Sequence, residues 1–270
     1  NGKYLCDGDT LLATAPAGLT ELTIPEGIAA IGEYAVGGCK QLLSITIPEG
    51  VASIGKGAFS KCEELTEISI PTSVSYIGAE AFQLCFKLTD VTIPEGVTTI
   101  EPKTFFNCNS LKRVSIPDSV TTISDNAFSV CPSLTDITIP ESITKTGQGA
   151  FGGGKRVKEI AIPEGVTALY DYTFSGCERL STLSLPSTLT SIGSRTFYSC
   201  RVLKEVTIPQ SVSTIGDSAF AHCQWLETVH CKSTTPPTIS DNTFSECAEG
   251  LTIYVPKGRG QNYKSAEERR

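Results

Sequence analysis

Eleven cysteines give this chain residues that could form disulfides or bind a metal ion. Nine of them recur almost every 23 residues, at Cys39, Cys62, Cys85, Cys108, Cys131, Cys177, Cys200, Cys223 and Cys247, and Gly154 fills the one vacant place. If residues one period apart stack directly, neighbouring thiols lie about 4.8 Å apart with parallel side chains. A disulfide needs Cβ atoms about 3.8 Å apart that point toward each other, and a straight column does not converge on the tetrahedron that zinc requires. We therefore predict buried, unpaired thiols, and leave open the state of Cys6 and Cys231, which lie off the column.

A glycine-rich run resembles two nucleotide-binding motifs. Residues 147–152 match G-x-G-x-x-G, and residues 149–155 match most of a phosphate loop. The second match fails at Arg156, where the loop needs Ser or Thr, and the first lacks the strand and helix that normally flank it. Thr146 and Gly154 replace the usual Ile and Cys of the period. The run is therefore interpreted as a degraded repeat, and we expect high mobility there.

The two histidines, His222 and His230, each precede a cysteine. Cys223 belongs to the buried column, so His222 beside it should point outward, and no Ser–His–Asp arrangement can be argued from two histidines near one end. The sequence predicts no catalytic residue, no metal site and no cofactor, and the chain is not expected to be an enzyme.

Acidic residues also recur in columns. One column follows the repeated prolines, at Glu26, Glu49, Glu95, Asp118, Glu141 and Glu164. The other holds Glu21, Glu67, Asp90, Asp136, Glu159 and Glu205, with Arg113 in the same series. The run from Glu95 to Glu164 suggests weak calcium binding, whereas the alternative is a solvated negative stripe that aids solubility.

Seven aromatic residues occupy positions that other repeats fill with polar residues: Tyr76, Phe86, Phe106, Tyr170, Tyr172, Tyr198 and Trp225. Exposed aromatic side chains are candidate anchors for protein contacts. The alternative is that they cover the rim of the core. They do not share one column, so the sequence predicts no single patch.

The elements that position these residues follow from the 23-residue period. Prolines repeat at Pro25, Pro48, Pro71, Pro94, Pro117, Pro140, Pro163, Pro186 and Pro209, and phenylalanines at Phe59, Phe82, Phe105, Phe128, Phe151, Phe174, Phe197 and Phe220. In the unit 65–87, alternating Ile68 and Ile70 predict a strand ended by Pro71. A second short extended piece follows at 74–77, and Ala81, Phe82 and Cys85 have the spacing of one or two helical turns.

One such unit cannot bury its apolar face alone, so the units must stack. Residues 1–270 are predicted to form one domain: an N-terminal cap at 1–18, with a hairpin at 3–16, the repeats at 19–228, and an irregular last repeat and C-terminal cap at 229–270. Within the last part, 251–256 reads as a strand, and 261–270 as a short helix or a frayed tail.

The unit L-x-x-I-T-I-P-E-G-V-T-x-I-G-x-x-A-F-x-x-C resembles the BspA-like leucine-rich repeats over residues 19–228. The segments 3–18, 231–237 and 255–264 resemble the ends of such proteins. The resemblance implies a β-rich α/β fold, a right-handed leucine-rich repeat solenoid of about ten repeats with caps at both ends. Members are typically secreted or surface proteins of host-associated bacteria, and several are implicated in adhesion to host matrix proteins.

Composition narrows the classes of function. The net charge of −7 argues against nucleic acid, which favours a basic face, and no apolar run is long enough to span a membrane. We expect a non-catalytic protein-binding or adhesion module, extracellular or at the cell surface, with a protein ligand such as a host extracellular matrix protein. The alternatives are a spacer without its own ligand and a weak calcium-binding module. A monomer is expected. The chain contains no Met, so any signal or anchor is expected outside it.

Overall fold

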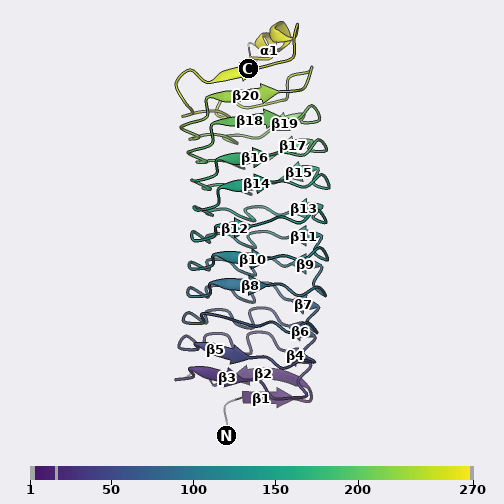
Figure 1. Cartoon of the computed structure of the whole chain (residues 1–270), viewed down its shortest axis with the longest axis vertical. Coiled ribbons are helices and arrows are strands. Elements are labelled where there is room, and N and C mark those ends of the chain that lie inside the picture. The colour runs from purple at the N-terminus through teal and green to yellow at the C-terminus, as the bar shows by residue number, and fades with distance from the viewer. Residues whose placement is uncertain (1–3, 16–17, 268–270) are drawn as a thin grey trace.

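The computed structural model describes residues 4–15 and 18–267, which form an elongated solenoid of about eleven turns (Figure 1). The two ends of the chain lie at opposite ends of the stack. Most turns contribute a short strand to a first face and a second short strand to another face, and a run of tight turns forms a third side. The predicted solenoid is confirmed, and the 23-residue period of the sequence is one turn of the coil.

Both strand faces are built from very short strands. The first face holds β3(Glu21–Thr23), β5(Ser44–Thr46), β8(Asp90–Thr92), β10(Arg113–Ser115), β12(Asp136–Ile137), β14(Glu159–Ala161), β16(Thr182–Ser184), β18(Glu205–Ile208), β20(Thr228–Cys231) and β21(Thr252–Tyr254). The second face holds β4(Ala30–Ile31), β6(Ser53–Ile54), β7(Tyr76–Ile77), β9(Thr99–Ile100), β11(Thr122–Ile123), β13(Lys145–Thr146), β15(Ala168–Leu169), β17(Ser191–Ile192) and β19(Thr214–Ile215).

Hydrogen bonding on the first face is interrupted. Its strands pair in parallel as β3–β5, β8–β10–β12, β14–β16 and β18–β20–β21, and not as one continuous sheet. The strand predicted around Ile68 and Ile70 is wrong for this turn, because residues 67–70 pair with neither neighbouring turn and form no strand. The second predicted piece of that turn is present as β7. Register within each pair follows the period, as when Val91 lies opposite Val114.

The third side of the coil is not helical, contrary to the helical turns predicted there. In the Phe82 turn, the N–H groups of Glu80, Phe82 and Leu84 donate to carbonyls of the following turn, each over 2.9 Å. An α-helix would use these donors within the chain segment itself, so bonding between turns excludes it. The chain instead alternates its backbone conformation, with positive φ at Glu80 and Leu84. The same two places have positive φ in neighbouring turns, at Lys103, Asn107, Asn126, Val130, Arg195, Ser199 and others.

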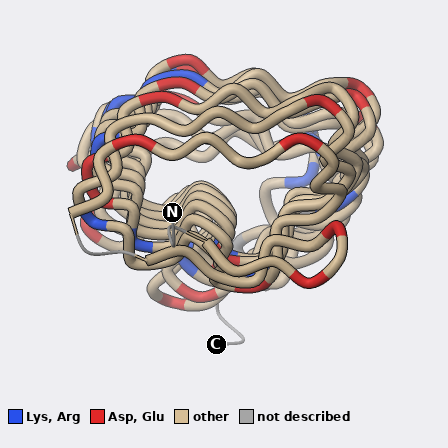
Figure 2. Tube along the Cα trace, turned by 90° about the horizontal axis from the view of Figure 1, so that it is seen from below, with Lys and Arg blue, Asp and Glu red and all other residues tan. Residues whose placement is uncertain are grey.

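A ladder of phenylalanine rings fills the core beside these turns. Successive rings from Phe59 to Phe220 stack with centroids 5.2 to 5.6 Å apart. Phe244 extends the ladder at 5.4 Å, although one extra residue separates it from Phe220. Charged residues occur all around the circumference of the coil (Figure 2), and none of the described ones is buried. The apolar residues of each turn therefore face one continuous interior, in which each turn covers the next.

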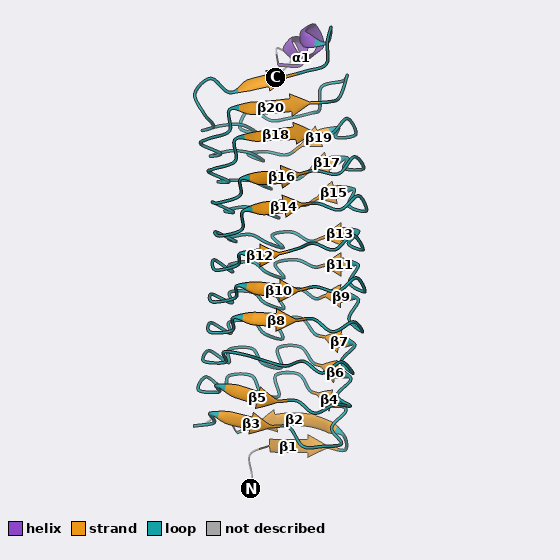
Figure 3. Cartoon of the chain, viewed as in Figure 1, coloured by secondary structure: helices purple, strands orange, loops and turns teal. Residues whose placement is uncertain are grey.

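The ends depart from the repeat. At the N-terminus, β1(Tyr4–Asp7) and β2(Thr10–Thr14) form an antiparallel hairpin, and β2 pairs with β4. Lys3 and Pro16 of the predicted cap lie outside the described residues. At the other end, β21 matches the predicted last strand, and α1(Gly260–Glu267) is a helix (Figure 3). The hydroxyl of Tyr263 on α1 donates to the carbonyl of Ser233 at 2.9 Å, which ties the helix to the solenoid. Residues 268–270 of the predicted tail are also outside the described part.

Candidate protein-binding surfaces

The cysteine column is a set of free, structural thiols. All eleven cysteines lie in the described residues and none forms a disulfide. Eight column thiols donate to a carbonyl of the preceding turn, as Cys85 does to Phe59 at 3.2 Å and Cys108 to Phe82 at 3.1 Å. The sequence indicated the burial of this column but not its hydrogen bonds, because the acceptor lies 26 positions earlier in another turn. Burial raises the pKa of Cys85 to about 12, so this thiol stays protonated at neutral pH.

Cys6 and Cys231, the two cysteines outside the column, differ in their exposure to solvent. Cys6 is exposed on β1, whereas Cys231 is buried at the end of β20. Burial raises the pKa of Cys231 to about 11, and burial also raises the pKa of the nearby Tyr263 hydroxyl to about 12. Cys231 therefore belongs to the packing of the C-terminal end.

In the glycine-rich run, the backbone N–H groups that a phosphate loop would offer to a ligand already donate hydrogen bonds to neighbouring turns or within their own turn. A Cβ on Gly147 would collide with the backbone nitrogen of Asp125, and Gly149 has a φ of +61°. The N–H of Gln148 donates to the carboxylate of Asp125 at 2.8 Å, and the N–H of Gly153 donates to the carbonyl of Ser175 at 2.6 Å. These glycines serve close packing between turns.

The carboxylate columns remain on the surface and do not converge. Within residues 4–15 and 18–267, no group of three or more His, Cys, Asp or Glu side chains gathers closely enough to hold a metal ion. Glu164 from the proposed calcium run instead accepts two hydrogen bonds from Ser187 in the next turn, from its N–H at 3.1 Å and its hydroxyl at 2.8 Å. These bonds hold the pKa of Glu164 below its usual range.

The candidate aromatic residues fall into two groups by exposure. Tyr76, Tyr170, Tyr172 and Trp225 are exposed, whereas Phe86, Phe106 and Tyr198 are half-buried. Tyr170 borders a shallow hollow of about 300 Å³ over β15, β17 and β19. Trp225 lies beside Lys204, whose ammonium is 5.7 Å from its ring centroid.

Two of the predicted residues, Tyr172 and Tyr198, meet through Arg195, which the sequence did not single out. The guanidinium of Arg195 lies 5.8 Å from the ring centroids of both Tyr172 and Tyr198, and it also donates to the Tyr172 hydroxyl at 3.3 Å. His222 packs edge-on against Tyr198, with centroids 4.9 Å apart. We call these four residues the aromatic–arginine cluster. It crosses three consecutive turns on the side of the tight turns.

A signal for this cluster was present in the sequence. Arg195 follows Tyr172 by one period of 23 residues, and His222 follows Tyr198 by 24. When successive 23-residue units are aligned by position alone, Arg195 falls at the position of Tyr172 and His222 falls next to the position of Tyr198, in each case one turn later. Tyr34, an exposed residue in the column of Tyr172, was missed as well, and its hydroxyl donates to Glu80 at 3.3 Å across two turns.

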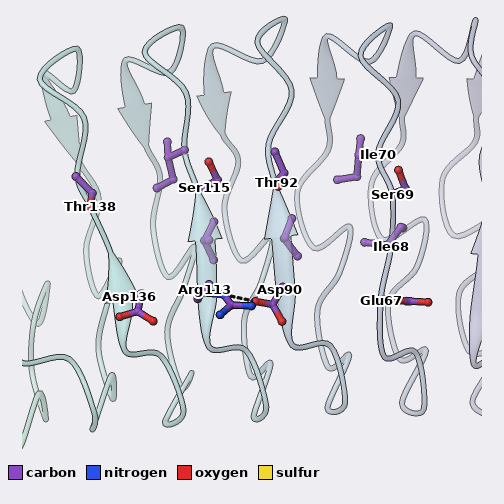
Figure 4. A pocket seen from close by; sticks show the side chains of 13 residues that line it. Glu67, Ile68, Ser69, Ile70, Asp90, Thr92, Arg113, Ser115, Asp136 and Thr138 are labelled. Atoms are coloured by element: carbon purple, nitrogen blue, oxygen red, sulfur yellow. Dashed lines mark ion pairs between the residues drawn. The ribbon is translucent and has the colours of Figure 1, made fainter.

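A second surface feature is a groove on the first face. It has a volume of about 850 Å³ and extends over four turns, from Glu67 to Thr138. The close-up in Figure 4 shows a row of charged side chains, Glu67, Asp90, Arg113 and Asp136, beside a row of hydroxyl side chains, Ser69, Thr92, Ser115 and Thr138. The charged column is recognisable in the sequence, whereas the hollow beside it has no sequence signal.

No helix within the described part of the chain has the length and apolar character needed to cross a membrane.

Comparisons with known proteins agree with this architecture. The profile of the BspA type leucine rich repeat region matches residues 15–135 and 121–252. A leucine-rich cell surface protein from Faecalibacterium prausnitzii is 26% identical, with a TM-score of 0.54 over 97% of this chain and 95% of that one. The pneumococcal vaccine antigen PcpA shares the fold at 19% identity, with a TM-score of 0.54 over 92% of this chain and 76% of that one. A comparison with curated proteins found no match. This chain belongs to the BspA-type leucine-rich repeat family.

Proposed function

We propose that the chain is a non-catalytic protein-binding module of a secreted or surface-held bacterial protein, and that its role is adhesion to a host protein. Its family and its similarity to a cell surface protein of Faecalibacterium prausnitzii support a location outside the cell. A solenoid suits binding because its repeated turns present a long, rigid surface to a partner.

The aromatic–arginine cluster is the observation that carries this proposal. Tyr and Arg dominate the energetic centres of protein interfaces because they offer large contact areas together with hydrogen-bond donors. Contacts on both sides of the Arg195 guanidinium hold it in place, so less side-chain entropy is lost when a partner binds. Arg195 itself is exposed. The four residues form a ready-made contact site.

The other candidate residues extend the proposed contact area. Tyr170 lies two positions before Tyr172 and is exposed beside its hollow. Trp225, with Lys204, lies three positions beyond His222. Tyr76, Phe86 and Phe106 belong to earlier turns and would act only with a partner that covers much of the rod.

Binding of the purified chain to a panel of immobilised extracellular matrix proteins tests the proposal. The variants Arg195→Ala and Tyr198→Ala should weaken binding at least tenfold if the cluster is an energetic centre. Tyr4→Ala serves as a control because Tyr4 is an exposed tyrosine in the N-terminal hairpin, far from the cluster, and is not a candidate contact residue. Thermal unfolding of each variant shows whether the fold is kept, which matters for the half-buried Tyr198.

A different result would favour the architectural alternative. If the chain binds no member of the panel, its role is that of a spacer that holds another part of the protein away from the cell. If a matrix protein binds the wild type and both cluster variants with equal affinity, the contact site lies elsewhere on the solenoid. That result would overturn the proposal that the aromatic–arginine cluster is the energetic centre of the interface.

A further inference from the structure

The groove on the first face lies where the hydrogen bonding between turns fails. Residues 67–70 run alongside β5 and β8, yet no described backbone hydrogen bond joins them to either strand. The ladder resumes at β8 and continues through β10 to β12, where it stops again. The groove spans this interval. At its first wall, the backbone N–H and C=O groups of residues 67–70 therefore lack the described hydrogen bonds by which paired strands hold their neighbours.

Three of the apolar residues that line the groove are half-buried, whereas Val91 and Val114 are buried. Ile68 is half-buried, whereas Ile45 and Ile160 in the same column are buried. Ile70 and Ile116, which also line the groove, are half-buried too. A ligand in the groove would thus meet apolar surface at its floor and polar side chains at its edges.

Two of the four charged side chains in the row of Glu67, Asp90, Arg113 and Asp136 form an ion pair with each other. Arg113 forms an ion pair with Asp90 at 2.5 Å, and the two charges cancel (Figure 4). Glu67 and Asp136 stand on either side of this pair, and neither has an ion-pair partner among the described residues. Asp136 accepts only a hydrogen bond from the Thr135 hydroxyl, at 3.1 Å. The groove therefore carries two open negative charges, one toward each end.

The distance between the Glu67 and Asp136 carboxylates determines how far apart the positive charges of a fitting ligand must lie. Three steps between turns, of about 5 Å each, place Glu67 and Asp136 roughly 15 Å apart. Four residues of an extended chain cover about 13 Å, and flexible Lys or Arg side chains span the remainder. Side chains at i and i+4 of an extended segment also point to the same face, because the period is two.

We propose that the groove binds an extended basic peptide segment with two Lys or Arg residues four positions apart. The basic residues contact Glu67 and Asp136, and the residue midway between them lies over the neutral Asp90–Arg113 pair. The hydroxyl row from Ser69 to Thr138 hydrogen-bonds the peptide main chain. This surface lies in other turns than the aromatic–arginine cluster, so the two proposals can fail independently.

Fluorescence anisotropy with labelled decapeptides tests the proposal on the full chain. The probe is a Ser/Thr/Val peptide with Lys at positions 3 and 7. A matched peptide with Lys at positions 3 and 6 has the same charge but places the two side chains on opposite faces. We expect the first peptide to bind at least threefold more tightly. Equal affinities would overturn the proposed geometry.

Protein variants test the site itself. The double variant Glu67→Gln/Asp136→Asn should weaken binding of the first peptide about fivefold or more, as expected for two partly exposed ion pairs. Glu159→Gln/Glu205→Gln removes the same number of charges from the same column outside the groove and should change affinity less than twofold. Equal weakening by both double variants would show general attraction to an acidic surface and would overturn the site. Arg195→Ala should leave peptide affinity unchanged, which separates this result from the adhesion test.

Discussion

The thiol of Cys85 donates a hydrogen bond to the carbonyl of Phe59, which lies 26 positions earlier in the chain and 3.2 Å away. The bond joins adjacent turns next to the stacked rings of Phe59 and Phe82, whose centroids are 5.3 Å apart. The cysteine column thus contributes both packing and bonds between turns.

Cys85→Ala should lower the free energy of unfolding by about 1–3 kcal/mol, because it removes a buried sulfur atom and leaves the Phe59 carbonyl without its thiol donor. Urea unfolding followed by circular dichroism measures the change. Cys6→Ala is the control, since Cys6 is exposed and should have no effect. A Cys85 variant as stable as wild type would show that the thiol bond contributes nothing.

Stability should fall at alkaline pH. Burial raises the pKa of Cys85, Cys131 and Cys177 from 9.0 to about 12. Above pH 9 the unfolded chain releases these protons while the folded chain retains them, so the stabilisation present below pH 9 is lost as pH rises toward 12. Each thiol contributes a slope of about 1.4 kcal/mol per pH unit. The difference in stability between wild type and Cys85→Ala should therefore shrink between pH 8 and pH 10 in urea titrations. A constant difference contradicts this account, and comparing the two proteins at each pH cancels the titration of Lys and Tyr.

Thr146→Val should stabilise the protein by about 1 kcal/mol or more. Thr146 is fully buried and its hydroxyl has no hydrogen-bond partner in the described structure, so it bears a desolvation cost that valine avoids. The matched control is Thr173→Val, another fully buried threonine, whose hydroxyl donates to the Tyr170 carbonyl at 2.7 Å. That control should be destabilised by about 1 kcal/mol. Thermal unfolding compares the two variants, and shifts of the same sign would refute the explanation.

Val130→Asn should also stabilise the protein, by about 1 kcal/mol. Val130 is exposed with a φ of 59°, a conformation that is costly for β-branched residues. Asn107 adopts the same conformation one turn earlier. Val130→Thr retains the branched side chain and should bring no gain. Calorimetric melting of both variants checks the expected order.

Hydrogen exchange should be faster over residues 146–156 than in neighbouring turns. Gly154 has no thiol to bond the preceding turn, and the buried hydroxyl of Thr146 has no hydrogen-bond partner in the described structure. Exchange measured by mass spectrometry on peptides from this turn and from the turn around Phe105 gives the comparison. Equal protection would mean that the substituted turn packs as well as the others.

The sequence by itself determined the period, the residues that face inward and the class of fold. Every turn uses the same register, so a residue type that recurs every 23 positions must occupy one place in the coil, and Phe and Cys mark the core unambiguously. Phe244 lies 24 residues after Phe220 instead of 23, yet its ring stacks on that of Phe220. Stacking depends on where a ring lies within its turn and not on the number of residues between the two rings.

Tertiary structure alone decided how each turn bonds to the next. The turn around Phe82 has the apolar spacing of a helix, yet its N–H groups bond the following turn. Residues 67–70 alternate like a strand, but a strand exists only where a neighbour comes within hydrogen-bonding distance. Likewise, the period places Arg195 one turn after Tyr172, but only the stacking of the turns brings its guanidinium to 5.8 Å from the ring centroids of both Tyr172 and Tyr198. Local pattern fixes which way a side chain faces, whereas distances between turns depend on the packing of the whole stack.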